Sequence, residues 1–308
     1  MTPRPFKQID VFTATPCFGN PLAVVLDGAG LSDEALQRFA HWTNLSETCF
    51  VLPPTEAGRA AGADYRVRIF TPGAELPFAG HPTLGTCHAW LEAGGVAQNP
   101  EFIVQECGVG LVRIRQRGQL RAFAAPALTR CVPDAKLLAA VIAALGLQPK
   151  QVLAAQLLDN GPVWLGLLLD SPETVLALDP DHARLKDMGQ KVGVASVRRS
   201  LDAIQLISRS SREAKAFDGH DMPTLAEPDL EVRAFAAPVG VNEDPVTGSL
   251  NASLAQWLIA DGHLPQRYLA GQGASLGRAG RVHIERDAQG EVWVGGECVT
   301  CIDGTVAL

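Results

Sequence analysis

One short pattern that could bind an anion occurs twice in the chain, and each copy stands where a helix is expected to begin. The copies read ELPFAGH (75–81) and EDPVTGS (243–249), each an acid, any residue, proline, two residues, glycine and a polar side chain. An Arg-x-Phe segment, 68–70 or 233–235, precedes each copy, and an apolar, alanine-rich stretch follows each. A strand, a loop and a helix that recur in this way predict two homologous half-domains.

The beginning of a helix favours anions, because its first N–H groups are unpaired and carry roughly half a positive charge. Two such ends facing one cleft could hold a substrate carboxylate and the charge that develops when a carbon acid loses a proton. Gly80 and Gly248 would let a ligand approach the backbone closely. The same residues also suit ordinary helix capping, so the sequence leaves both interpretations open.

Four side chains in or near these loops could carry the chemistry. Glu47, between a helix and an apolar strand, could be a general acid or base, or merely a solvated residue where the strand starts. At a helix N-terminus His81 is expected to be neutral, and it could meet a ligand or cap the helix. Asp244 could contact a ligand amine or hydroxyl, or cap. Ser249 could bind a carboxylate, or bond to its own helix.

Composition restricts the class of protein. The 308 residues, 47% hydrophobic and 19% charged, are enough for two cores. A net charge of −7 without a basic stripe argues against nucleic-acid binding. No apolar run approaches the roughly 20 residues that a membrane span needs. Seven scattered cysteines and the lack of a signal peptide favour a reducing cytoplasm. Only Cys298 and Cys301 have metal-like spacing, and no second pair completes a metal site.

The element pattern predicts an α+β protein in which each half curls a mostly antiparallel sheet around one long apolar helix. We expect an N-terminal half over 1–128, which a last strand around 296–308 could complete, and a C-terminal half over 129–295, with the active site in the cleft between them. Helices are expected from Ser32, from Gly80 to about residue 94, over 134–145, and from the second motif to about Gly262. Strands are expected at 9–13, 23–26, 48–52, 65–71, 102–105, 110–117, 120–125, 152–157, 163–169, 203–208, 231–235, 281–286, 291–294 and 300–307.

Four motifs, in order along the chain, carry a resemblance to a known family. They are FGNPLAVV (18–25), NLSET (44–48), GHPTLGT (80–86) and NEDPVTGS (242–249). Together they resemble the PhzF family of phenazine biosynthesis proteins over essentially the whole chain. The resemblance implies the diaminopimelate-epimerase-like fold, whose two pseudo-symmetric halves meet at a cleft. That fold agrees with the internal repeat.

The resemblance also implies an activity, the isomerisation of trans-2,3-dihydro-3-hydroxyanthranilate without cofactor or metal, in a homodimer. Glu47 matches the family's acid/base, which takes a proton from one ring carbon and returns it at another. By the same resemblance, His81 and Asp244 would orient the amino and hydroxyl groups. Ser249, with backbone N–H groups near Gly80 and Gly248, would hold the carboxylate.

Two alternatives stay open. One is a cofactor-free epimerase or racemase of an amino-acid-like substrate, although related racemases place cysteines where this chain has His81 and Ser249. The other is a non-catalytic protein that binds small carboxylates. Departures from the family pattern at Gly271-Gln272-Gly273 and Arg278-Ala279, expected at the cleft rim or in a turn, leave the identity of the substrate open.

Overall fold

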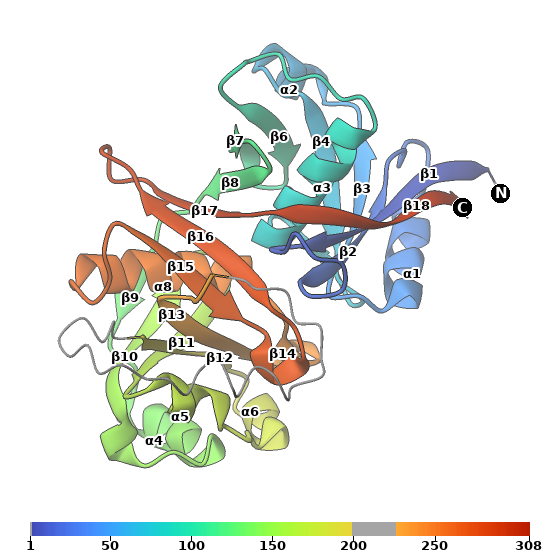
Figure 1. The fold of residues 1–308 in the computed structure, drawn as a ribbon. Helices are drawn as coiled ribbons and strands as arrows, with labels where there is room; N and C mark the ends of the chain where they lie inside the picture. The colour runs from blue at the N-terminus through green and yellow to red at the C-terminus, as the bar shows by residue number, and fades with distance from the viewer. Residues whose placement is uncertain (1, 199–225) are drawn as a thin grey trace, which may run out of the picture.

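A computed structural model of the chain describes residues 2–198 and 226–308 (Figure 1). Its strands are β1 (Pro3–Val11), β2 (Asn20–Val25), β3 (Thr48–Leu52), β4 (Tyr65–Phe70), β5 (Glu75–Leu76), β6 (Ile103–Cys107), β7 (Gly110–Arg117), β8 (Leu120–Ala124), β9 (Thr129–Cys131), β10 (Val152–Asp159), β11 (Val163–Leu169), β12 (Lys191–Val197), β13 (Leu230–Ala236), β14 (Val241–Asp244), β15 (Arg267–Gln272), β16 (Gly280–Arg286), β17 (Val292–Gly296) and β18 (Cys298–Ala307). Its α-helices are α1 (Asp33–Thr43), α2 (Glu56–Ala60), α3 (Gly80–Glu92), α4 (Ala135–Ala144), α5 (Pro172–Leu176), α6 (His182–Asp187) and α8 (Gly248–Ala260), and its 3-10 helices are η1 (Pro149–Gln151), η2 (Ala237–Val239) and η3 (Ala274–Leu276). The strand expected at 203–208 lies outside the described residues.

The strands follow one pairing pattern twice. The series β1-β2-β3-β4-β6-β7-β8 matches the series β10-β11-β12-β13-β15-β16-β17 pair by pair. In both series the second and third strands are parallel, as are the fourth and fifth, and the other neighbours are antiparallel. The short strands β5 and β14 pair with β4 and β13 in the same way. The expected α+β fold with two pseudo-symmetric halves is confirmed.

One long helix lies against the curved sheet of each half (Figure 1). Both α3 and α8 are 13 residues long, and each begins at the glycine of its motif. They carry almost no charge, because Glu92 at the end of α3 is their only acidic or basic residue other than histidine. A helix that is apolar on nearly all sides is stable only when it is surrounded, and nearly all of both helices is buried.

Strand pairing also connects the two series. β17 pairs antiparallel with β8, β9 pairs antiparallel with β10, and β18 returns to pair antiparallel with β1. The division of the chain at residues 128 and 295 stays a prediction. Cys298 is buried on β18, whereas Cys301 is exposed. Within the described residues, no three His, Cys, Asp or Glu side chains gather as a metal site would require, and no helix is long and apolar enough to span a bilayer.

The acid of each motif pairs with the arginine of the strand before it. Arg68 on β4 binds Glu75 through two contacts of 2.7 and 2.6 Å, and Arg233 on β13 binds Glu243 through contacts of 3.0 and 2.8 Å. Each pair clamps the hairpin that leads to the motif glycine. The repeated Arg and Glu therefore position the two helix starts.

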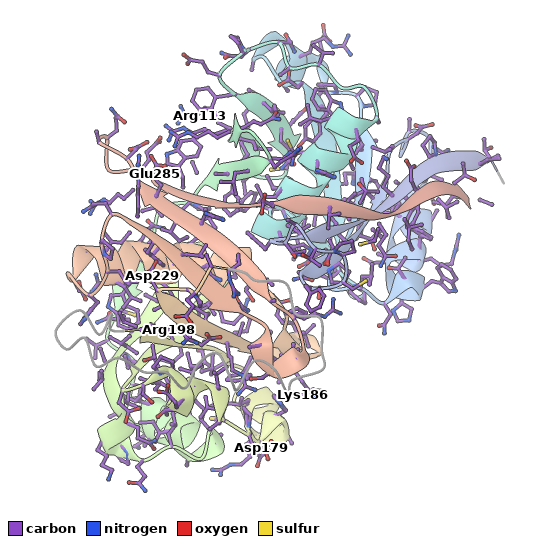
Figure 2. All side chains as sticks on the ribbon, viewed as in Figure 1. Arg113, Asp179, Lys186, Arg198, Asp229 and Glu285 are labelled. Atoms are coloured by element: carbon purple, nitrogen blue, oxygen red, sulfur yellow. The ribbon has the colours of Figure 1, made fainter. Side chains whose placement is uncertain are left out.

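A row of arginines joins the halves on the outside of the sheet. Arg113, Arg115 and Arg117 alternate along β7, so that they share one face. Figure 2 labels Arg113 and Glu285 near this edge. The ion pairs are Arg113–Glu291 at 3.1 Å, Arg115–Asp287 at 3.1 Å and Arg117–Glu285 at 2.9 Å.

Candidate active site

The N-termini of α3 and α8 meet at their glycines. A Cβ placed on Gly248 would lie 3.1 Å from the Cα of Gly80 and 3.1 Å from the backbone N of His81. A Cβ placed on Gly80 would collide with the ring of Phe123. Glycine at both positions therefore permits this backbone approach without a clash. The two helix starts that the motifs predict are therefore brought together.

Neither helix start is capped by a side chain. The N-cap residues Ala79 and Thr247 make no side-chain hydrogen bond to the first turn of α3 or α8. By contrast, Ser32 accepts a hydrogen bond from a backbone N–H of α1 in the ordinary manner. The capping interpretation of the two motifs is wrong, and both ends keep backbone N–H groups that can serve an anion.

A turn between α1 and β3 places Glu47 beside the meeting helix starts. Asn44 ends α1 in the left-handed conformation, with a φ of 54°, which reverses the chain ahead of β3. Thr48 and the next three residues of β3 are buried, so Glu47 directly precedes a buried, mostly apolar strand. Its side chain is only 17% exposed. Glu47 is therefore held in place, and it is not the solvated residue of the alternative interpretation.

His81 is buried directly against Glu47. Nδ1 of His81 lies 3.1 Å from Oε2 of Glu47, and within the described part of the chain Nε2 of His81 has no hydrogen-bond partner. Burial lowers the pKa of His81, but the negative charges of Glu47 and Asp244 outweigh it, and the pKa is raised above its usual value. The expectation of a neutral histidine rested on the helix end alone, and the carboxylates of Glu47 and Asp244 act in the opposite direction.

Asp244 approaches the same junction from the other half. Its Oδ1 accepts a hydrogen bond of 3.0 Å from Nδ2 of Asn20, and its Oδ2 accepts one of 2.5 Å from the hydroxyl of Thr247. Burial raises the pKa of Asp244 to about 6, with the charge of Glu47 as the next cause. Glu47, His81 and Asp244 thus form one electrostatically coupled group, here called the cleft cluster.

Ser249 occupies the position in α8 that His81 has in α3. Its Oγ accepts a hydrogen bond of 3.2 Å from Nε1 of Trp164, and its carbonyl accepts one of 3.0 Å from Nδ2 of Asn160. Among the described residues the hydroxyl hydrogen of Ser249 has no acceptor, and the hydroxyl does not bond to its own helix as the alternative supposed. The side chain is half-buried.

The position of Gln272 differs from the expectation. Gln272 was expected at the rim, but it is 1% exposed, behind the loop that holds Asp244. Arg278 and Ala279 do lie at a junction, where the guanidinium and the backbone N–H reach carbonyls of the loop that precedes Asn20. Asn20, Thr247 and Gln272 are all in motifs visible in the sequence. Their hydrogen bonds depend on contacts between residues about 25 and 224 positions apart, and no local pattern reveals these.

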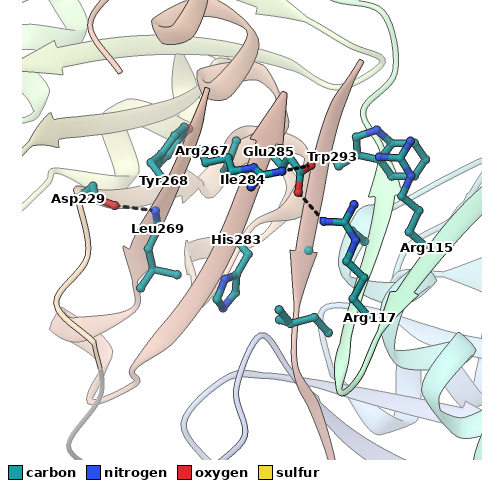
Figure 3. Close-up of a pocket in the computed structure, with 13 residues that line it drawn as sticks. Arg115, Arg117, Asp229, Arg267, Tyr268, Leu269, His283, Ile284, Glu285 and Trp293 are labelled. Atoms are coloured by element: carbon teal, nitrogen blue, oxygen red, sulfur yellow. Dashed lines mark hydrogen bonds and ion pairs between the residues drawn. The ribbon is translucent and has the colours of Figure 1, made fainter. Parts of the chain in front are cut away.

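One hollow lies away from the cleft cluster, lined by β7, β8 and β15 to β17 (Figure 3). It encloses about 390 Å³, and its lining includes Arg115, Arg117, Arg267, His283 and Glu285. Figure 3 shows Arg117 and Arg267 both paired with Glu285. None of its lining residues belongs to the cleft cluster, so its size alone gives no reason to place the chemistry there.

The geometry can be compared with known proteins. The model of the family described as phenazine biosynthesis-like protein, PhzC-PhzF, matches residues 9–304. The chain belongs to this family. As a PhzF-family protein with relatives named isomerases, it is an enzyme of the isomerase class.

Individual relatives match nearly the whole chain. Antisense-enhancing sequence 1 of Schizosaccharomyces pombe is 34% identical, covering 99% of both chains. The trans-2,3-dihydro-3-hydroxyanthranilate isomerase of Pseudomonas aeruginosa is 32% identical, covering 93% of this chain and 91% of its own. The crystal structure of a PhzF-family protein from Enterococcus faecalis is 25% identical and covers all of both chains, with a TM-score of 0.76.

Proposed function

We propose that this protein moves a proton between two carbons of a small carboxylic acid that carries amino and hydroxyl groups, without a cofactor. The first candidate substrate is trans-2,3-dihydro-3-hydroxyanthranilate, the compound named for the relative from Pseudomonas aeruginosa. The observation that carries the proposal is the contact of Glu47 with His81, beside two uncapped helix starts that meet at Gly80 and Gly248.

Glu47 is proposed as the acid/base. Its carboxylate takes a proton from one carbon, and the electron pair left behind spreads into the conjugated substrate. The carboxylic acid so formed returns the same proton to a different carbon, so that atoms and charge balance. One carboxylate on one face of the substrate is sufficient for such a shift.

The remaining site residues are proposed to bind and orient. Ser249, with the backbone N–H groups near Gly80 and Gly248, holds the substrate carboxylate, since open helix starts favour anions. His81 and Asp244 orient the amino and hydroxyl groups. The raised pKa of His81 supports a role as hydrogen-bond donor, because both of its nitrogens carry hydrogen when it is protonated.

The test is conversion in deuterated buffer. The purified protein is incubated with trans-2,3-dihydro-3-hydroxyanthranilate and followed by absorbance and proton NMR, beside Glu47→Gln and Glu56→Gln. Glu56 is exposed in α2, so its variant controls for the loss of one surface carboxylate. We expect the intact protein and Glu56→Gln to convert the substrate and Glu47→Gln to lose conversion. Undiminished conversion by Glu47→Gln contradicts the role of Glu47.

A cofactor-free epimerase or racemase is the alternative activity of the same site. It would exchange solvent deuterium at a stereocentre without moving a double bond, and the same NMR spectra distinguish the two outcomes. A non-catalytic carboxylate-binding protein would bind ligand equally well after Glu47→Gln. The direct contact between Glu47 and His81 supports the isomerase, because binding alone does not need a base at that place.

We also propose a homodimer that works in the cytoplasm. The seven cysteines are all free, which supports a reducing compartment. Light scattering coupled to size-exclusion chromatography would give twice the chain mass of 32.7 kDa if the dimer forms.

A further inference from the structure

The hydrogen bonds behind Asp244 have a fixed direction, which starts from backbone groups. Oε1 of Gln272 accepts from the backbone N–H of Thr247 at 3.0 Å, and Nε2 of Gln272 donates to the carbonyl of Asp244 at 3.0 Å. A backbone N–H can only donate and a carbonyl can only accept. The amide of Gln272 can therefore adopt only one orientation.

This orientation decides the direction of the Thr247 hydroxyl. The second hydrogen on Nε2 of Gln272 is donated to Oγ1 of Thr247 at 2.9 Å. A hydroxyl has one hydrogen, and that of Thr247 is directed to Oδ2 of Asp244 at 2.5 Å. The side chain of Asn251 fills the remaining acceptor position on Oε1 of Gln272, at 2.8 Å, so the glutamine has no spare capacity to turn.

The other oxygen of Asp244 is fixed in the same way from the N-terminal half. Nδ2 of Asn20 donates to the carbonyl of Val246 at 2.9 Å, which again sets the orientation of the amide. Its second hydrogen goes to Oδ1 of Asp244 at 3.0 Å. Oδ1 of Asp244 thus accepts a hydrogen bond whose direction it cannot reverse, and Oδ2 accepts the hydroxyl hydrogen of Thr247, for which the described residues provide no other acceptor.

We infer that Gln272 and Thr247 are positioning residues that keep Asp244 as a hydrogen-bond acceptor, so that the group the substrate presents to Asp244 must be a donor, an amino group above all. The inference rests on the proposed function for the substrate but concerns Asp244 in the free protein too. Gln272 makes no hydrogen bond to the carboxylate of Asp244, and it acts through the Thr247 hydroxyl and the backbone of the loop.

The arrangement opposes the other forces on Asp244. Burial and the charge of Glu47 favour its neutral form, whereas the bonds from Thr247 and Asn20 and the charge of His81 favour the carboxylate. These are the titratable and polar groups that act on Asp244 from β2, the turn before β3, and α3 and from its own loop. Without the Thr247 hydroxyl, the pKa of Asp244 should rise. As the pH is lowered, Asp244 then becomes protonated, and stops acting as an acceptor, at a higher pH than in the unaltered protein.

The first test measures Asp244 directly. Protein labelled with 13C at aspartate carboxyls is titrated by NMR, with the Asp244 resonance assigned by its loss in Asp244→Asn. Because a hydrogen bond to a charged group is worth on the order of one pKa unit, Thr247→Val should raise the titration midpoint of Asp244 by about one unit. Thr247→Ser, which keeps the hydroxyl, should restore the midpoint of the unaltered protein.

The matched control is Thr86→Val, the same change at a buried position in the second turn of α3. It should leave the Asp244 midpoint unchanged. If Thr247→Val does not fold, as judged by circular dichroism, Thr247→Ala removes the same hydroxyl and carries the same prediction. An unshifted midpoint in a folded Thr247 variant overturns the inference. This titration needs no turnover, so its failure is distinct from failure of the Glu47→Gln test.

The second test addresses the donor. Calorimetry at pH 8 compares 3-hydroxyanthranilate with 3-hydroxybenzoate, which lacks only the amino group. A site that must pair a buried acceptor rejects a ligand without the donor, so we expect at least about tenfold weaker binding of the hydroxybenzoate. Equal affinity of the two acids would show that Asp244 does not select a donor.

Discussion

The two motif loops share one scaffold but present different chemistry. In each half an arginine and a glutamate clamp a hairpin, and a glycine begins a 13-residue buried helix. The first loop then offers His81 in contact with Glu47, while the second offers Ser249, held by Trp164. The two halves therefore share the groups that place the helix starts and differ in the side chains that can react.

The two clamps differ in burial. The side chains of Arg68 and Glu75 are 19% and 41% exposed, whereas those of Arg233 and Glu243 are 6% and 7% exposed. Arg233 also donates to two backbone carbonyls, those of Val175 and Leu178. The second hairpin therefore depends on a pair that cannot be broken without leaving a charge inside the protein.

The largest effect should come from replacing the acid/base beside the first helix start, and a different effect from replacing the serine of the second. Glu47→Gln should lower kcat by about a thousandfold, in the range typical of a lost general acid or base. Ser249→Ala should act mainly on KM, raising it about tenfold, because it removes a hydrogen bond to a charged ligand group. Steady-state kinetics of both variants checks this split. A Ser249→Ala variant that loses kcat as severely as Glu47→Gln would contradict the division of roles.

The two clamps should differ strongly in stability. Arg233→Met leaves Glu243 buried without its partner and should lower the free energy of unfolding by about 3 kcal/mol. Arg68→Met breaks the equivalent pair near solvent and should cost about 1 kcal/mol or less. Urea unfolding of the two variants measures the difference. Equal losses would mean that burial does not distinguish the clamps.

The pH dependence should report on the second loop. Asp244, with a pKa raised to about 6, must be ionised to accept a substrate donor, so kcat/KM should fall as the pH drops through about 6. Because the pKa of His81 is raised, loss of its proton, and with it loss of activity, should occur at a pH above the usual histidine value. In Asp244→Asn the acid limb near pH 6 should disappear from the residual activity. Its persistence would assign that limb to another group.

The smallest effect is expected on the outer face. Arg117 and Glu285 are paired at 2.9 Å, but the arginine side chain is 64% exposed. Arg117→Ala should therefore change the free energy of unfolding by no more than about 1 kcal/mol and leave kcat/KM unchanged. Unfolding and kinetic measurements on this variant provide the baseline for the Arg233→Met result.

Much of this arrangement was predictable from the residues. The repeat of acid, proline, glycine and polar residue predicted two helix starts, and the apolar, alanine-rich stretches that follow predicted helices buried by curled sheets. The approach of Gly80 to Gly248 could be expected only as a possibility of the fold, because it depends on how the halves pack. The local sequence pattern indicates where a helix forms, but it does not indicate how close in space two segments 168 residues apart will lie.

The protonation of the site was harder to predict. The helix end near His81 was visible in the sequence, but the carboxylate 3.1 Å away was not, and that neighbour decides the direction of the pKa shift. Gln272 was noticed only as an unusual flank at a rim. Its buried position follows from the pairing of β15 with β13, which brings it beneath the loop of Asp244.

The contact between Gly80 and Gly248 has an evolutionary consequence. A side chain at Gly248 would press on the backbone of Gly80 and His81 in the other copy, and a side chain at Gly80 would collide with the ring of Phe123. Both glycines are therefore constrained by space, whereas the residues that follow them, His81 and Ser249, already differ. New activities on this scaffold should therefore arise by changes at the second residue of each helix, while the glycine before it is inherited unchanged.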